Sequence, residues 1–152
     1  MTDVQALMAP LFAELPLEQA MPNLLPQRKA AGKAYELAEA IEPKLPSREL
    51  KAGLWLYVDD IDRSHQICQD IPNQMGSFWH AIVHRREGDF SNSKYWLRQA
   101  GGSPIEMPGY APVRLVDAVS VARGDDPALL DLQRREWQEM FRHCAEQAEE
   151  KA

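Results

Sequence analysis

Eleven prolines spread over 152 residues limit this chain to short regular elements. Proline has no backbone N–H and clashes with the preceding helical turn, so it ends a helix or lies in its first turn, and it is excluded from central strands. Between the prolines, apolar residues recur every three or four positions, which is typical of helices that bury one face. The sequence therefore predicts an all-α fold of about six or seven helices in a single domain over residues 1–152.

The predicted helices have recognisable ends. Ser47 can cap a helix, Asp59-Asp60 reads as a tight turn, and Gly88 can close a later helix. Asp126-Pro127 is a strong start for a long C-terminal helix. Residues 113–121 are ambiguous, because their β-branched side chains suggest a strand whereas the neighbouring elements are helical, and we favour a short helix. The other helices are expected at 3–14, 27–42, 48–58, 61–70, 78–87, 91–100 and 127–149.

A weak internal repeat lies in the middle of the chain, with equivalent residues 29 positions apart. The matched pairs are Ala52 with Ala81, Leu54 with Val83, Asp60 with Asp89, Ile61 with Phe90, and Ser64 with Ser93. Small residues at these places let paired helices approach closely, and an Asp lies in each turn between helices. The pattern predicts two central αα-hairpins that are similar to tetratricopeptide-like hairpins, although those repeat at about 34 residues.

The charge balance excludes some classes of partner. A net charge of −6 argues against a general nucleic-acid binder and against docking on anionic lipid. No uncharged apolar run is long enough for a membrane span, and the N-terminal residues do not resemble a signal peptide. Cys68 and Cys144 each lie on an apolar helix stripe, which favours buried free thiols over a disulfide and a cytoplasmic location.

The segment 76–98 concentrates aromatic, His, Arg and acidic residues. On a helix, His80, His84 and Glu87 share one side, and this spacing can present two imidazoles and a carboxylate to one divalent metal ion. His65, on the preceding helix, is the expected third imidazole. The alternative, which is the more common arrangement of such residues, is a solvated or hydrogen-bonded face opposite the apolar stripe. Ala81 stands where a zinc protease has its glutamate, so that chemistry is excluded.

On the same helix, Arg85 falls at the edge of the apolar side and Arg86 falls within that side. An arginine in such a place must be paired or must reach water. One interpretation pairs them with Asp60, Asp89 or Glu87. The other has them bind a carboxylate or phosphate of a ligand.

Four more side chains near this segment have two interpretations each. Asp59 and Asp62 can face the histidines across adjacent hairpins, or can cap the start of the helix that carries His65. Tyr95 and Trp96 can belong to the core, or can form the wall of a small apolar pocket.

The stretch from Asp59 to His65, followed by Gly76 to Trp96, resembles a family of small bacterial helical proteins to which no activity is assigned. The shared pattern is Gly-Ser-aromatic-Trp-His-x-Ile-x-His-Arg-Arg-Glu, then Asp-x-x-Asn-x-Lys-Tyr-Trp, and it covers about a third of the chain. The resemblance implies that its polar and aromatic residues belong together: His80, His84, Arg85, Arg86, Glu87, Asp89, Asn92, Lys94, Tyr95 and Trp96.

Two functions follow from these patterns. The first is a small-ligand site, with or without catalysis, on the 59–65 and 78–96 helices. His65, His80 and His84 would bind a divalent metal, and His80, His84 and Glu87 are the catalytic candidates. An anionic ligand would be bound by Arg85, Arg86, Asp89, Asn92, Lys94, Tyr95 and Trp96. The alternative is a non-catalytic helical module that binds a peptide or partner protein. The many ionisable residues favour the ligand site, because a partner groove needs exposed apolar surface.

Overall fold

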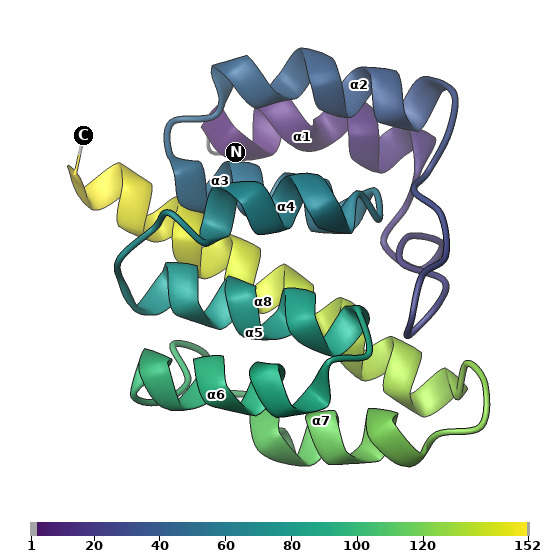
Figure 1. The fold of residues 1–152 in the computed structure, drawn as a ribbon. Helices are drawn as coiled ribbons and strands as arrows, with labels where there is room; N and C mark the ends of the chain where they lie inside the picture. The colour runs from purple at the N-terminus through teal and green to yellow at the C-terminus, as the bar shows by residue number, and fades with distance from the viewer. Residues whose placement is uncertain (1–2, 152) are drawn as a thin grey trace.

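The computed structural model describes residues 3–151, and within that range it contains eight α-helices, one 3-10 turn and no strand (Figure 1). The all-α prediction is confirmed: the eight helices correspond to the eight segments named from the sequence, one more than the six or seven helices expected for the fold. The elements are α1 (Asp3–Glu14), α2 (Lys33–Ile41), η1 (Glu42–Lys44), α3 (Arg48–Tyr57), α4 (Ile61–Cys68), α5 (Gln74–Arg86), α6 (Phe90–Ala100), α7 (Pro112–Val121) and α8 (Pro127–Lys151).

Two helix starts differ from the sequence prediction, and local backbone chemistry explains both. The helix expected from residue 27 begins only at Lys33, because Gly32 before it has a φ of 66°, outside the helical region. The helix expected from residue 78 begins at Gln74, because the side chain of Asn73 accepts a hydrogen bond from the Gly76 amide and caps it. The ambiguous segment 113–121 is helical and forms most of α7.

The predicted repeat is visible in matching hydrogen bonds of two hairpins, α3–α4 and α5–α6. The hydroxyl of Ser64 on α4 donates to the carbonyl of Ala52 on α3, at 2.8 Å. Twenty-nine residues later, Ser93 on α6 donates to Ala81 on α5, at 2.6 Å. Both serines are buried, so each bond joins the two helices of its hairpin at the point of close approach.

The turns of the two hairpins also match. Asp60 and Asp89 cap α4 and α6 by accepting a backbone N–H three residues ahead. The residue before each cap has a positive φ, 60° at Asp59 and 81° at Gly88. Asp59 thus occupies a position that glycine takes in the second hairpin, and Asp is one of the few side chains that tolerate this conformation.

Helix α8 lies across the hairpins and closes the core (Figure 1). The indole of Trp137 on α8 donates to the carbonyl of Gly53 on α3, at 2.8 Å. A Cβ atom at Gly53 would come within 2.8 Å of the Trp79 ring and 2.9 Å of the Phe141 ring, so only glycine allows α3, α5 and α8 to meet here. Cys68 and Cys144 are free and buried, as expected.

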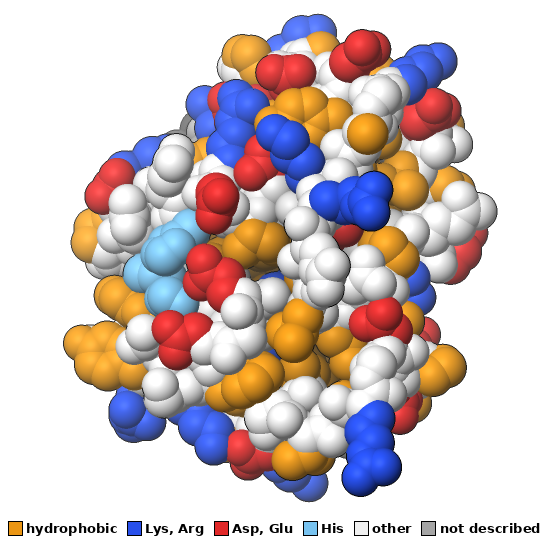
Figure 2. Space-filling model, turned by 45° about the vertical axis from the view of Figure 1, so that its right-hand side comes forward, with side chains coloured by type: hydrophobic (Ala, Val, Ile, Leu, Met, Phe, Trp, Pro, Cys, Tyr) orange, Lys and Arg blue, Asp and Glu red, His pale blue; other side chains and the backbone are white. Residues whose placement is uncertain are grey.

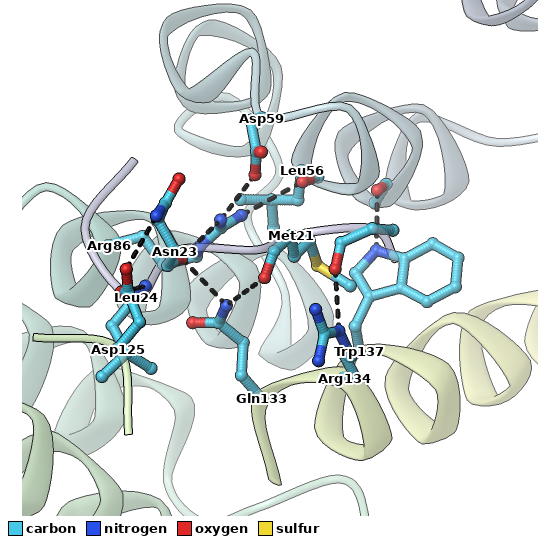
Figure 3. Close-up of polar contacts among 12 residues, drawn as sticks. Met21, Asn23, Leu24, Leu56, Asp59, Arg86, Asp125, Gln133, Arg134 and Trp137 are labelled. Atoms are coloured by element: carbon cyan, nitrogen blue, oxygen red, sulfur yellow. Dashed lines mark hydrogen bonds and ion pairs between the residues drawn. The ribbon is translucent and has the colours of Figure 1, made fainter. Parts of the chain in front are cut away.

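The long connection between α1 and α2 is fixed to the body of the protein by side chains of α8 (Figure 3). Arg134 donates to the carbonyl of Ala20, at 2.8 Å. Gln133, which is buried, donates to the carbonyls of Met21 and Asn23. These bonds satisfy backbone groups of a segment that has no helix of its own. Over residues 3–151 no helix has both the length and the apolar character required to cross a bilayer.

The guanidinium of Arg86, only 1% exposed, is the second anchor of this connection (Figure 3). It lies 2.5 Å from a carboxylate oxygen of Asp59 and donates to the carbonyls of Leu56 and Asn23. One side chain therefore joins the end of α5, the α3–α4 turn and the N-terminal connection. Burial raises the pKa of Asp59, and the charge of Arg86 opposes that rise.

We expect Arg86→Met to destabilise the protein by about 3–5 kcal/mol, because it leaves the Asp59 carboxylate buried without its counter-charge. Urea denaturation gives the free energy of unfolding. Asp59→Asn in the Arg86→Met background should recover part of the loss, and Arg135→Met, at an exposed i,i+4 pair with Asp131, should change stability by less than about 0.5 kcal/mol. Equal effects of Arg86→Met and Arg135→Met would contradict the role given to the buried pair.

Candidate functional site

Three histidines converge between the two hairpins. One nitrogen from each of His65, His80 and His84 lies within 4.8 Å of the others. The Nε2 atoms of His65 and His80 are 3.0 Å apart. The ring centroids of His80 and His84 are 4.7 Å apart at an interplanar angle of 21°, so these two rings are stacked. The structure therefore brings together the three imidazoles that the sequence selected.

The helices explain this convergence. His80 and His84 are one turn apart on α5, and His65 lies in the last turn of α4, which packs against α5. Of the expected alternative, a solvated or hydrogen-bonded face, the solvated form is wrong for the two α5 histidines, because His80 is 5% and His84 8% exposed. The hydrogen-bonded form fits His80, whose Nε2 lies 3.0 Å from that of His65. Helix α5 contacts α3, α4 and α6, so its polar side faces other helices and not bulk water.

Glu87 lies at the outer edge of the histidine cluster. Its Oε1 is 2.9 Å from Nδ1 of His84, and its Oε2 is 3.6 Å from Nδ1 of His65. The shorter contact favours the tautomer of His84 that carries hydrogen on Nδ1, which leaves the lone pair on Nε2. One carboxylate thus lies beside two imidazoles from different helices.

Trp96 of α6, which is half-buried, covers one face of the His80 ring. Its ring stacks on His80 with centroids 4.0 Å apart and an interplanar angle of 22°. Burial, then the neighbouring His84 and His65, lowers the pKa of His80 from 6.5 to about 4. His80 is therefore neutral at physiological pH, with a lone pair available for a ligand bond.

Arg85 and Arg86 have other partners than the sequence suggested. Arg85 pairs with Glu136 of α8, at 2.9 Å, and Tyr110 donates to the same carboxylate at 2.6 Å. Arg86 pairs with Asp59, as described above. The interpretation that both arginines pair with carboxylates of the protein is confirmed, whereas the partners named from the sequence, Asp60, Asp89 and Glu87, are wrong. Both guanidinium groups are almost completely buried in these pairs, so anion binding by them does not fit this geometry.

The other expected ligand-binding residues are dispersed. Asp89 caps α6 and accepts from the Asn92 amide side chain at 2.7 Å, so both serve the turn. Lys94 points to α7, where it pairs with Asp117 at 2.5 Å. Tyr95 is exposed on α6. Of this group, Trp96 stacks on His80, and a carboxylate oxygen of Asp89 lies 3.8 Å from Nδ1 of His84.

Sequence reasoning missed two sets of residues around the cluster. It did not select Glu136 of α8, which pairs with Arg85, or Tyr110 of the α6–α7 loop, which donates to the same carboxylate. It also overlooked Arg28 and Lys29, which line a pocket together with Glu87. No local pattern connects them with the histidines, because their proximity arises from the path of the α1–α2 connection.

The histidine cluster fits a divalent transition metal. Zinc–nitrogen bonds of about 2.0–2.1 Å in a tetrahedron place ligand nitrogens roughly 3.3 Å apart. The Nε2 atoms of His65 and His80, 3.0 Å apart, are close to this spacing, and one nitrogen of each of the three histidines lies within 4.8 Å of the others. The carboxylate of Glu87 is not among the atoms that meet within 4.8 Å, so it would act on the imidazoles and not on the ion. Three protein ligands leave one coordination position open.

Comparisons with models of protein families, with curated proteins and with solved structures find no match to this chain.

We expect His80 of the metal-free protein to titrate near pH 4. The unfolded chain takes up this proton near pH 6.5, so the native state loses stability as the pH falls from about 6.5 to 4. Two-dimensional NMR of the imidazole C–H groups, assigned with a His80→Gln variant, measures the midpoint. A midpoint at or above 6 would show that burial and the two neighbouring imidazoles do not act on this ring.

Proposed function

We propose that this protein binds a divalent transition-metal ion through His65, His80 and His84 and uses the open coordination position to bind, and to activate, a small ligand. The observation that carries the proposal is the convergence of three histidine nitrogens within 4.8 Å, from two helices of different hairpins. Imidazole nitrogen is a preferred ligand of zinc, iron, nickel and copper. Three histidines with a vacant fourth position are typical of metal sites that bind water or substrate.

The surroundings of the cluster support this proposal. Imidazole must be neutral to bind a metal, and burial keeps His80 neutral well below pH 7. A carboxylate that faces Nδ1 of His65 and His84 is the usual outer partner of metal-binding histidines. When an ion is bound, it supplies Lewis acidity and lowers the pKa of a coordinated water. Glu87, at the edge of the cluster, is then the carboxylate placed to take up a proton from that side.

The alternative function, a protein- or peptide-binding module, would use a groove of the hairpins. A pocket of about 670 Å³ with an apolar floor is present, but it is lined by α1, the following loop and α8, and by no residue of α3–α6. This pocket therefore does not belong to the hairpins, whereas the histidine cluster does, and for this reason we favour the metal site. A cytoplasmic location is proposed because a reducing compartment keeps buried thiols free.

We expect the purified protein to bind one Zn²⁺ or Co²⁺ per chain, with the Co²⁺ absorption spectrum of a four-coordinate nitrogen site. His65→Gln, His80→Gln and His84→Gln should each weaken binding by more than the roughly 10- to 100-fold caused by loss of an outer partner. His143→Gln, at the fourth histidine of the sequence, is the matched control and should bind normally. The same affinity for all four variants, measured by calorimetry, would overturn the proposal.

Glu87→Gln should weaken metal binding by about 10- to 100-fold while the protein remains folded, because the amide keeps the shape but orients the two imidazoles less well. Circular dichroism checks the fold, and competition with a chelator measures the affinity. Asp62→Asn, on α4 near His65, is a control that removes a carboxylate without an expected effect on metal affinity. An unchanged affinity in Glu87→Gln would exclude the orienting role.

A further inference from the structure

The pocket of about 670 Å³ is separate from the histidine cluster. It is lined by α1, the loop that follows α1, and α8, whereas the histidines of the cluster belong to α4 and α5. Figure 2 shows the face of the molecule on which histidine side chains gather at the surface, among acidic residues. The volume of the pocket is in the range of sites for small molecules, and the proposed metal function does not use it. The pocket is therefore a candidate for a second binding site.

Aromatic side chains give this pocket a rigid floor. Met8 of α1 and Trp137 and Phe141 of α8 are almost completely buried. The indole N–H of Trp137 already donates to Gly53, and its ring stacks on Phe141 with centroids 4.7 Å apart. The ring of Phe12 meets that of Trp137 edge to face, with centroids 6.2 Å apart, and so joins α1 to α8. Because these rings are fixed and the indole N–H is satisfied, the floor can receive an apolar group without rearrangement.

The pocket is a slot and not a broad docking face. The large apolar side chains that are exposed among residues 3–151 all lie outside it: Leu25, Tyr95, Val113 and Val121. A stable interface with another protein buries about 800 Å² on each partner and has an apolar centre. The nearly buried floor of this pocket offers no such surface, and it suits the narrow apolar part of a small molecule.

The rim of the pocket is acidic and carries one arginine and three carboxylates: Arg142, Glu139, Glu146 and Glu149. Arg142 is bonded to Glu139, and its guanidinium lies 3.8 Å from Glu146. Glu149 is exposed and, among residues 3–151, makes no ion pair or side-chain hydrogen bond. Residues 3–27 contain no lysine or arginine, so α1 and its loop add no positive charge. The rim therefore favours a positively charged ligand group.

We propose that this pocket binds an elongated organic amine, whose apolar body lies on the aromatic floor and whose ammonium group lies beside Glu146 and Glu149. A helix rises about 1.5 Å per residue, so these carboxylates follow Phe141 by roughly 7.5 and 12 Å along the axis of α8. A short alkyl chain between an aromatic ring and an ammonium group spans such a distance. The amine site is a second function of the protein, independent of the metal site.

The test uses three probes that share a phenylbutyl body: 4-phenylbutylamine, 4-phenylbutan-1-ol and 4-phenylbutyrate, which are positive, neutral and negative at neutral pH. Two-dimensional ¹H–¹⁵N NMR of the full chain gives each dissociation constant, and the signals that shift locate the bound probe. An ion pair at an exposed site is worth up to about fivefold in affinity. We expect the amine to bind about threefold to tenfold more tightly than the alcohol, the butyrate to bind most weakly, and the shifts to lie in α1 and α8.

The double variant Glu146→Gln/Glu149→Gln should make the affinity for the amine equal to that for the alcohol, while the affinity for the alcohol stays unchanged. The matched control Glu36→Gln/Glu106→Gln removes the same charge from exposed residues outside the pocket and should keep the preference. Ala145→Leu, which places a larger side chain in the lining, should weaken the binding of all three probes.

Equal affinities of the native protein for the amine and the butyrate would overturn the amine pocket, as would shifts confined to other helices or no detectable binding of any probe. The pocket shares no residue with the histidine cluster, so the affinity for Co²⁺ should be the same in all these variants. Loss of Co²⁺ binding in the native protein would contradict the metal site and leave the amine pocket standing.

Discussion

The arrangement of the central helices depends on the buried ion pair between Arg86 and Asp59. Its guanidinium also donates to carbonyls of the α3–α4 turn and of the N-terminal connection, so three segments far apart in sequence meet at one charged group. An unpaired charge at this depth is costly, and every conformation that separates the pair is therefore disfavoured. Because Arg86 stands next to Glu87 and two residues after His84, the pair also fixes the turn that presents the site.

The site arises where the two hairpins meet and is not repeated within either. His84 is equivalent to Trp55 of the first hairpin, and His65 is equivalent to Lys94 of the second, by the 29-residue spacing. The hydrogen bonds that build each hairpin are thus shared, whereas the imidazoles are particular to the α4–α5 boundary. The two hairpins are built in the same way, and the functional groups, the imidazoles, lie only at the boundary between them.

The sequence predicted the helices well because their signals are local. Proline spacing, apolar periodicity and caps such as Ser47 act within a few residues. The histidine cluster could also be predicted, since His80 and His84 share a helix face and His65 lies in the neighbouring helix. The partners of the arginines could not, because Glu136 is 51 residues from Arg85, and nothing in the sequence indicates which part of α8 will cross α5. Burial of the histidines was missed for the same reason.

The contact between two of the imidazoles shows how an ion could enter. The Nε2 atoms of His65 and His80 are 3.0 Å apart, so one of them carries the hydrogen that the other accepts. That hydrogen occupies the region between the imidazoles, where a metal would lie. Metal binding then needs only a change of tautomer on the donating ring, from Nε2–H to Nδ1–H, with no net loss of a proton. Because burial already keeps His80 neutral, metal affinity in the range above pH 5 depends little on protonation of this ring.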